Sequence, residues 1–163
     1  MLRRLTPLLA ITLATVACGP DSASPTDRES DVYATLIQAL APSDPTERAT
    51  SEEIDELDRV VYAGSLDEEQ PISLEVQAAV VEQLEDFATV RFVDERAEAI
   101  DDTDDREPVL EDGVLILLGR VPSGRKPSVD AERYVDIEDT VHVRVTVERA
   151  DGDWDVASVD RLG

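Results

Sequence analysis

Several residue types that proteins use for chemistry are nearly absent from this chain of 163 residues. It has one cysteine (Cys18), one histidine (His142) and one lysine (Lys126), and aromatic residues make up only 4% of it. A disulfide within the chain needs two cysteines, and zinc sites of the Cys and His type need several such ligands, so the composition excludes both. A nucleophilic triad could be built only on His142.

Positive charge is also scarce. The chain has 15 Lys and Arg residues against 38 Asp and Glu residues, for a net charge of −23. Residues 1–17 contain Arg3 and Arg4 and no acid, so a chain beginning at Cys18 has 13 basic and 38 acidic residues and a charge of −25. This balance excludes a protein that coats nucleic acid, and we expect the domain to be repelled by anionic lipid headgroups. The near absence of lysine indicates GC-rich coding or adaptation to salt.

The chain contains no apolar run long enough to form a permanent transmembrane helix. Residues 5–16 form an apolar run of roughly a dozen residues, which as a helix falls well short of the ~30 Å hydrocarbon core. A basic head with Arg3 and Arg4 precedes the run, and small residues follow it. This order is the layout of a secretory signal peptide, which we assign to residues 1–17.

Cys18 stands where the new N-terminus would be after removal of the signal. The segment Thr15-Val16-Ala17-Cys18 resembles a bacterial lipoprotein lipobox, although the family usually has Leu or another aliphatic residue at the position of Thr15. The resemblance implies acylation of the Cys18 thiol by palmitate-type chains and anchoring on the extracytoplasmic face of the cell membrane. The alternatives are ordinary secretion with a free thiol, or a chance cysteine within a signal peptide.

The remaining chain divides into a tether and one domain. Residues 19–25 are rich in Gly, Pro, Ser and Asp and have nothing to bury, so we assign residues 18–30 to the lipidated cysteine and a flexible tether. Residues 31–163 are enough for a single acidic domain.

Two helices are predicted within this domain or at its start. Thr26 and Glu29 have the form of a capping box, ahead of an apolar stripe that ends before Pro42. Ser73 is the predicted N-cap of a second helix, whose apolar residues recur four apart from Ile72 to Leu84. The acidic stretch between them contains at most one short turn of helix, at residues 51–57.

The strand predictions rest on three kinds of pattern. Residues 59–63, 89–93 and 134–137 are short runs rich in β-branched or aromatic residues, whereas the apolar run at residues 114–118 indicates a strand buried on both faces at the centre of the sheet. Alternating valines from Val141 to Val147, followed by Asp151 and Gly152, predict a C-terminal hairpin. Its register places Val147 opposite Val156 and Arg149 opposite Trp154, where cation and ring could stack. The fold class is therefore α+β: a single antiparallel or mixed sheet of four to six strands, two helices on one face and a C-terminal hairpin.

Candidate site residues are few. Asp101, Asp102, Asp104 and Asp105 offer oxygens that could bind calcium, but the loop lacks the glycine of an EF-hand, and a solvated acidic loop is the alternative. His142 lies on the polar side of its predicted strand, where a lone histidine is a solvated side chain. A second surface feature is a basic cluster around Gly124, which could bind a phosphate or acidic partner without forming a P-loop: Arg120, Arg125 and Lys126. We assign no catalytic residue.

The chain resembles uncharacterised lipoprotein-type domains of high-GC Gram-positive bacteria at residues 32–33 and 36–37 of the first predicted helix and at residues 92–96, 113–119 and 147–156. The resemblance transfers no activity. We expect a monomeric, lipid-anchored extracytoplasmic protein that binds an envelope protein or a ligand without catalysis and requires no cofactor. The alternative is an envelope hydrolase that uses carboxylates with the help of calcium.

Overall fold

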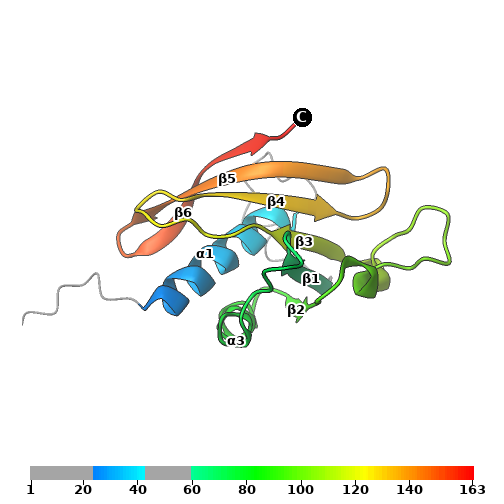
Figure 1. Ribbon diagram of the computed structural model, residues 1–163, viewed down its shortest axis with the longest axis horizontal. Coiled ribbons are helices and arrows are strands. Elements are labelled where there is room, and N and C mark those ends of the chain that lie inside the picture. Colours follow the sequence, from blue (N-terminus) through cyan, green and yellow to red (C-terminus); the bar gives the residue numbers. More distant parts are fainter. Residues whose placement is uncertain (1–23, 43–59) are drawn as a thin grey trace, which may run out of the picture.

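The apolar run Val114–Leu118 forms strand β3, which is buried along its whole length inside a six-stranded mixed sheet. The computed structural model describes residues 24–42 and 60–163. The strands lie in the order β2-β1-β3-β4-β5-β6 (Figure 1). The sheet, two α-helices and terminal hairpin confirm the predicted α+β class.

Three strands at one side of the sheet are parallel. β1 (Val60–Ser65) pairs with β2 (Thr89–Phe92) and with β3, and helix α3 (Leu74–Gln83) connects β1 to β2. Parallel neighbours require a crossover of this kind, because a tight turn can only reverse the chain. β4 (Ser128–Tyr134), β5 (Thr140–Ala150) and β6 (Asp153–Arg161) then continue the sheet in antiparallel fashion.

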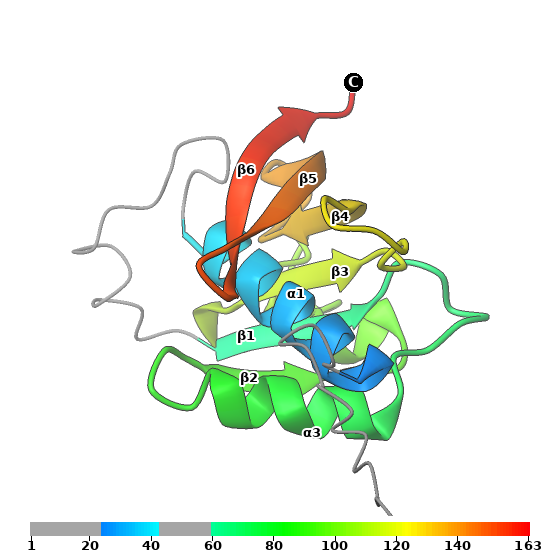
Figure 2. The same ribbon diagram turned by 90° about the vertical axis from the view of Figure 1, so that its left-hand side faces the viewer.

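Helices α1 (Pro25–Leu40) and α3 cover the same face of the sheet, as predicted (Figure 2). The side chains of Val32, Leu36 and Ile37 on α1 are completely buried against it. The helix begins earlier than the sequence suggested: Ser24 is the N-cap, and its side chain accepts a hydrogen bond from the backbone N–H of Asp27. Pro25 suits the first helical position because its missing N–H needs no partner there, so α1 includes residues that we expected in the tether.

The opposite face of the sheet is covered only in part. The segment from Val93 to Gly113 crosses β1 and β3 and contains two short 3-10 helices, η1 (Arg96–Ala99) and η2 (Leu110–Asp112). Its apolar residues close a smaller core over this face, with Tyr62, Leu115, Leu117 and Tyr134. The polar sides of β4 and β5 remain open beyond it.

The terminal hairpin has the predicted register. Val147 lies opposite Val156 and Arg149 opposite Trp154, and both turn residues, Asp151 and Gly152, have the positive φ angles of a type I′ turn. The proposed stacking pair is different, however. Arg149 donates from Nε to the carbonyl of Gly152, and the guanidinium of Arg28 lies 5.5 Å from the centre of the Trp154 ring.

The prediction for the fourth strand was wrong. β4 spans Ser128–Tyr134, whereas residues 135–139 form a turn in which Asp136 Oδ1 accepts hydrogen bonds from the N–H groups of Glu138 and Asp139. Along β4 the residues that face the helices are Val129, Ala131 and Arg133. Because Arg133 is charged, the sequence of β4 does not show the regular alternation of apolar and polar residues that indicates a strand. The residues expected to form the signal peptide, the tether up to residue 23 and the turn at 51–57 lie outside the described residues.

Candidate functional site

The open face of β4 and β5 carries a ladder of polar side chains. Asp130 lies opposite Arg144, which donates from Nε at 2.6 Å and from Nη2 at 2.9 Å to the two carboxylate oxygens. These hydrogen bonds hold the pKa of Asp130 below its ordinary value. Two residues along, Glu132 lies opposite His142. We call Asp130, Glu132, His142 and Arg144 the open-face ladder.

Glu132 differs from its neighbours because it is buried. Its side chain is 7% exposed, and one carboxylate oxygen pairs with the guanidinium of Arg96 at the start of η1. The same guanidinium lies 4.2 Å from the centre of the Tyr134 ring. Arg96 thus joins the covering segment to the sheet through an ion pair and a cation–π contact.

The second carboxylate oxygen of Glu132 faces the only histidine. His142 Nδ1 lies 3.6 Å from Glu132 Oε2, and the imidazole is 56% exposed. The Thr146 hydroxyl is 2.8 Å from that of Ser128, and the Thr140 hydroxyl donates to the carbonyl of Asp136. His142 therefore presents an imidazole to solvent beside a buried carboxylate, and the neighbouring hydroxyls make hydrogen bonds to other groups.

A shallow hollow of about 540 Å³ continues this face toward the connection between β3 and β4. Its lining includes the Asp130 and Arg144 pair, together with Ser128, Gly119 and Leu66. It offers both signs of charge and a small apolar surface to a partner.

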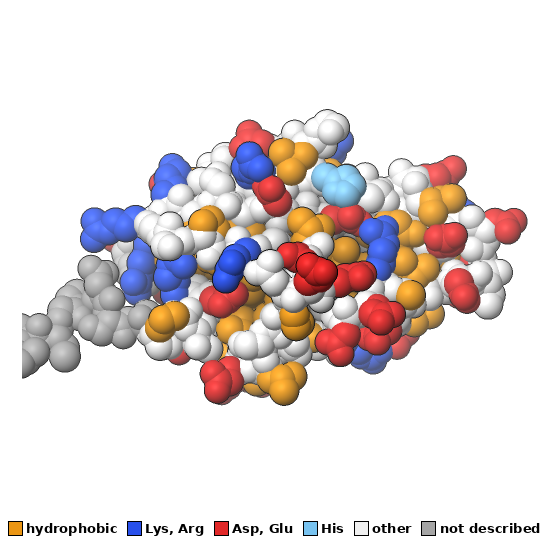
Figure 3. All heavy atoms as spheres, viewed as in Figure 1, with side chains coloured by type: hydrophobic (Ala, Val, Ile, Leu, Met, Phe, Trp, Pro, Cys, Tyr) orange, Lys and Arg blue, Asp and Glu red, His pale blue; other side chains and the backbone are white. Residues whose placement is uncertain are grey.

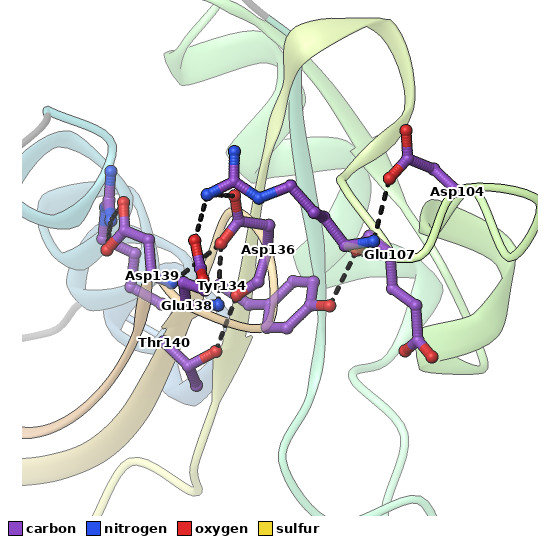
Figure 4. A network of polar contacts seen from close by, with 9 residues as sticks. Asp104, Glu107, Tyr134, Asp136, Glu138, Asp139 and Thr140 are labelled. Atoms are coloured by element: carbon purple, nitrogen blue, oxygen red, sulfur yellow. Dashed lines mark hydrogen bonds and ion pairs between the residues drawn. The ribbon is translucent and has the colours of Figure 1, made fainter.

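The four aspartates expected as calcium ligands serve the loop itself or lie in solvent. Asp101 Oδ1 accepts hydrogen bonds from the N–H and hydroxyl of Thr103, which lower the pKa of Asp101. Asp104 Oδ1 accepts from the N–H of Arg106 (Figure 4). Asp102 and Asp105 are exposed. In residues 24–42 and 60–163, no three acidic, histidine or cysteine side chains converge as a metal site would require.

The acidic loop is instead attached to the turn between β4 and β5. The Arg106 guanidinium pairs with Glu138 and lies 3.9 Å from Asp136, and the Tyr134 hydroxyl donates to the carbonyl of Glu107 at 2.7 Å (Figure 4). These contacts bring residues about thirty positions apart into one network that attaches the charged loop to the sheet.

Sequence reasoning missed the most enclosed member of the site. Glu132 fell outside the predicted strands, so its position opposite His142 was not foreseen. Val129 and Ala131 carried a weak alternation that could have placed Glu132 on the polar side of a strand.

Among the described residues, no helix is long and apolar enough to cross a membrane. Comparison of the chain with family models, curated proteins and solved structures gives no match.

Proposed function

We propose that the chain is a lipid-anchored extracytoplasmic protein, acylated on Cys18, whose folded domain binds a protein or ligand outside the membrane. One observation carries the anchor: the only cysteine of the chain directly follows a basic head, an apolar run and small residues. Signal peptides have that order, and a cysteine at the cleavage point adds a thiol to which a lipid group can be attached.

The open-face ladder supports binding as the task of the domain. Helices bury the other face, whereas Asp130, His142 and Arg144 keep 41–56% of their side chains exposed on this one. Strand side chains are held in a fixed spacing, so these charges form a rigid pattern that can select a partner of complementary charge.

The alternative of a calcium-assisted hydrolase gains no such support. The acidic loop places its carboxylates in turns and ion pairs, and within the described part of the chain no group of them converges on a common point. We therefore propose binding rather than hydrolysis.

The anchor is tested by labelling cells with radioactive palmitate. The wild-type chain should take up label and sediment with membranes, and Cys18→Ser should do neither. Thr15→Leu should increase the processed fraction because it restores the aliphatic residue, and Ser22→Ala is the matched control. A Cys18→Ser chain that still incorporates palmitate would contradict the proposal.

Binding through the open face is tested by exchanging one ion pair. The double variant Asp130→Arg with Arg144→Asp preserves an ion pair between β4 and β5 but reverses the charges that a partner meets. Crosslinking in intact membranes should give an adduct with the wild-type chain and not with this variant. An adduct of unchanged yield would show that the partner binds elsewhere.

A further inference from the structure

Charge is segregated along the strands of the domain. β5 has 11 residues, so it is about 36 Å long at ~3.3 Å per residue. At its Thr140 end lie the turn at 135–139 and the segment 94–112, which contains ten acids and only two arginines. We call this the acidic end.

The opposite end of the strands carries a basic cluster. The connection between β3 and β4 lies there, because Ser128 pairs with Thr146 and the Val147 N–H donates to the carbonyl of Pro127. The start of α1 joins it through hydrogen bonds from the Arg28 guanidinium to the carbonyls of Pro122 and Gly124.

Five basic residues of this region form what we call the anchor-end cluster: Arg28, Arg120, Arg125, Lys126 and Arg149. Acids lie among these residues: Glu148 pairs with Lys126 at 3.0 Å, Asp67 lines the same hollow as Arg120, and Asp27, Asp151 and Asp153 lie at the start of α1 and at the hairpin turn. This end is therefore less acidic than the other and carries most of its basic residues close together. Figure 3 shows Lys and Arg gathered at the end where α1 begins in Figure 1, and Asp and Glu prevailing toward the other end. The cluster is therefore a local feature in a strongly acidic protein.

The anchor-end cluster lies where the chain leaves the domain toward Cys18. Ser24 caps α1, and six residue-to-residue steps separate it from Cys18, so even a fully extended chain spans at most about 22 Å. That reach is shorter than β5. The acidic end lies about the length of β5 away from the cluster, which is several times the Debye length of about 8 Å at physiological ionic strength.

We propose that the anchor-end cluster contacts the anionic phospholipid headgroups of the membrane that carries the chain, so that the acidic end faces outward. This proposal rests on the proposed acylation of Cys18. The short connection brings the cluster to the surface, and the negative surface potential attracts it while repelling the distant acidic loops. Net charge alone predicts uniform repulsion, whereas the charge distribution predicts a preferred orientation.

The orientation can be measured with the only tryptophan. Trp154 lies at the anchor end, since its ring contacts the Arg28 guanidinium. We would reconstitute the full acylated chain, extracted from membranes, into vesicles containing a dansyl-labelled phosphatidylethanolamine. Energy transfer from Trp154 to dansyl should be higher in vesicles with 30% phosphatidylglycerol than in pure phosphatidylcholine, and 0.5 M salt should abolish the difference.

Charge variants then show which residues cause the difference in energy transfer between the two kinds of vesicle. Arg120→Glu with Lys126→Glu should remove the difference between the two vesicles, whereas Arg106→Glu at the acidic end should retain it. If the reversed pair perturbs folding, judged by circular dichroism, the milder Arg120→Gln with Lys126→Gln should reduce the difference in part.

The mass of the same sample separates the two proposals. An acylated chain with equal transfer in both vesicles overturns the orientation and leaves the anchor intact. A chain without acyl groups overturns the anchor and the orientation together.

Discussion

Glu132 on β4 lies directly opposite His142 on β5, with Oε2 of the carboxylate 3.6 Å from Nδ1 of the imidazole. The other carboxylate oxygen pairs with Arg96. Glu132 thus connects an exposed face of the sheet to the segment that covers its neighbouring part. We expect the stability of the domain to depend on the charge of Glu132.

Replacing Glu132 by Gln should lower the free energy of unfolding by roughly 1–2 kcal/mol, because the Arg96 guanidinium loses its charged partner. The loss is limited because the Arg96 side chain is 36% exposed and water can solvate it. Urea denaturation measures the change. Glu138→Gln is the matched control, since that residue pairs with Arg106 at the surface, and it should cost less than about 0.5 kcal/mol. Equal losses for the two variants would contradict a special role for Glu132.

Arg133 offers a test of a buried charge. Its side chain is 1% exposed on the helix-covered face, and Nη1 donates to both carboxylate oxygens of Asp139 at 3.1 Å, whereas Nε has no hydrogen-bond partner among the described residues. Removing only the acceptor charge, in Asp139→Asn, should destabilise the domain by about 1–3 kcal/mol. Arg133→Met should cost less, because an apolar side chain of similar length needs no partner there. A greater loss for Arg133→Met in thermal unfolding would show that the guanidinium is a net source of stability.

Acid should destabilise the domain through its hydrogen-bonded carboxylates. Arg144 lowers the pKa of Asp130, and backbone N–H groups lower the pKa of Asp136. A lowered folded-state pKa stabilises the fold at pH values above the ordinary aspartate value of about 3.9, and this contribution is lost as the pH falls through the folded-state pKa. Unfolding in urea between about pH 6 and pH 2 should therefore show falling stability. Arg144→Gln should make the decline shallower, and an unchanged slope would exclude the Asp130 pair as a contributor.

Gly119 should not tolerate a side chain. A Cβ atom added there would lie 2.6 Å from the carbonyl oxygen of Asp130, which accepts a hydrogen bond from the Gly119 N–H at 2.7 Å. Gly119→Ala should lower the free energy of unfolding by about 1–3 kcal/mol, since two backbone segments must separate. Gly163→Ala, with nothing within 4 Å, should be neutral. A Gly119→Ala protein of unchanged stability would mean that Gly119 and Asp130 can move apart without a measurable loss of free energy, and would contradict this prediction.

The elements that could be predicted were those whose pattern is local. The apolar run of β3, the valine alternation of β5 and the Asp151-Gly152 turn each specify a strand or hairpin from neighbouring residues, and all three are confirmed. β4 was missed because Arg133 occupies an inward position that alternation assigns to an apolar residue, which leaves only the weak alternation of Val129 and Ala131. Its burial depends on Asp139, in the turn that follows.

The same reason limited the prediction of the site. His142 was identified as exposed on a polar strand face, but the pairing of Glu132 with Arg96 joins residues 36 positions apart and needs the fold. The aspartates of the acidic loop were recognised as a cluster, yet spacing alone could not show that Asp101 and Asp104 turn their oxygens toward nearby N–H groups.

The intact mass of the protein extracted from membranes tests the acylation of Cys18 most directly. We expect a chain that begins at Cys18 and carries the added mass of a diacylglyceryl group. A chain that retains Met1, begins at another residue or carries an unmodified Cys18 would contradict acylation at this residue.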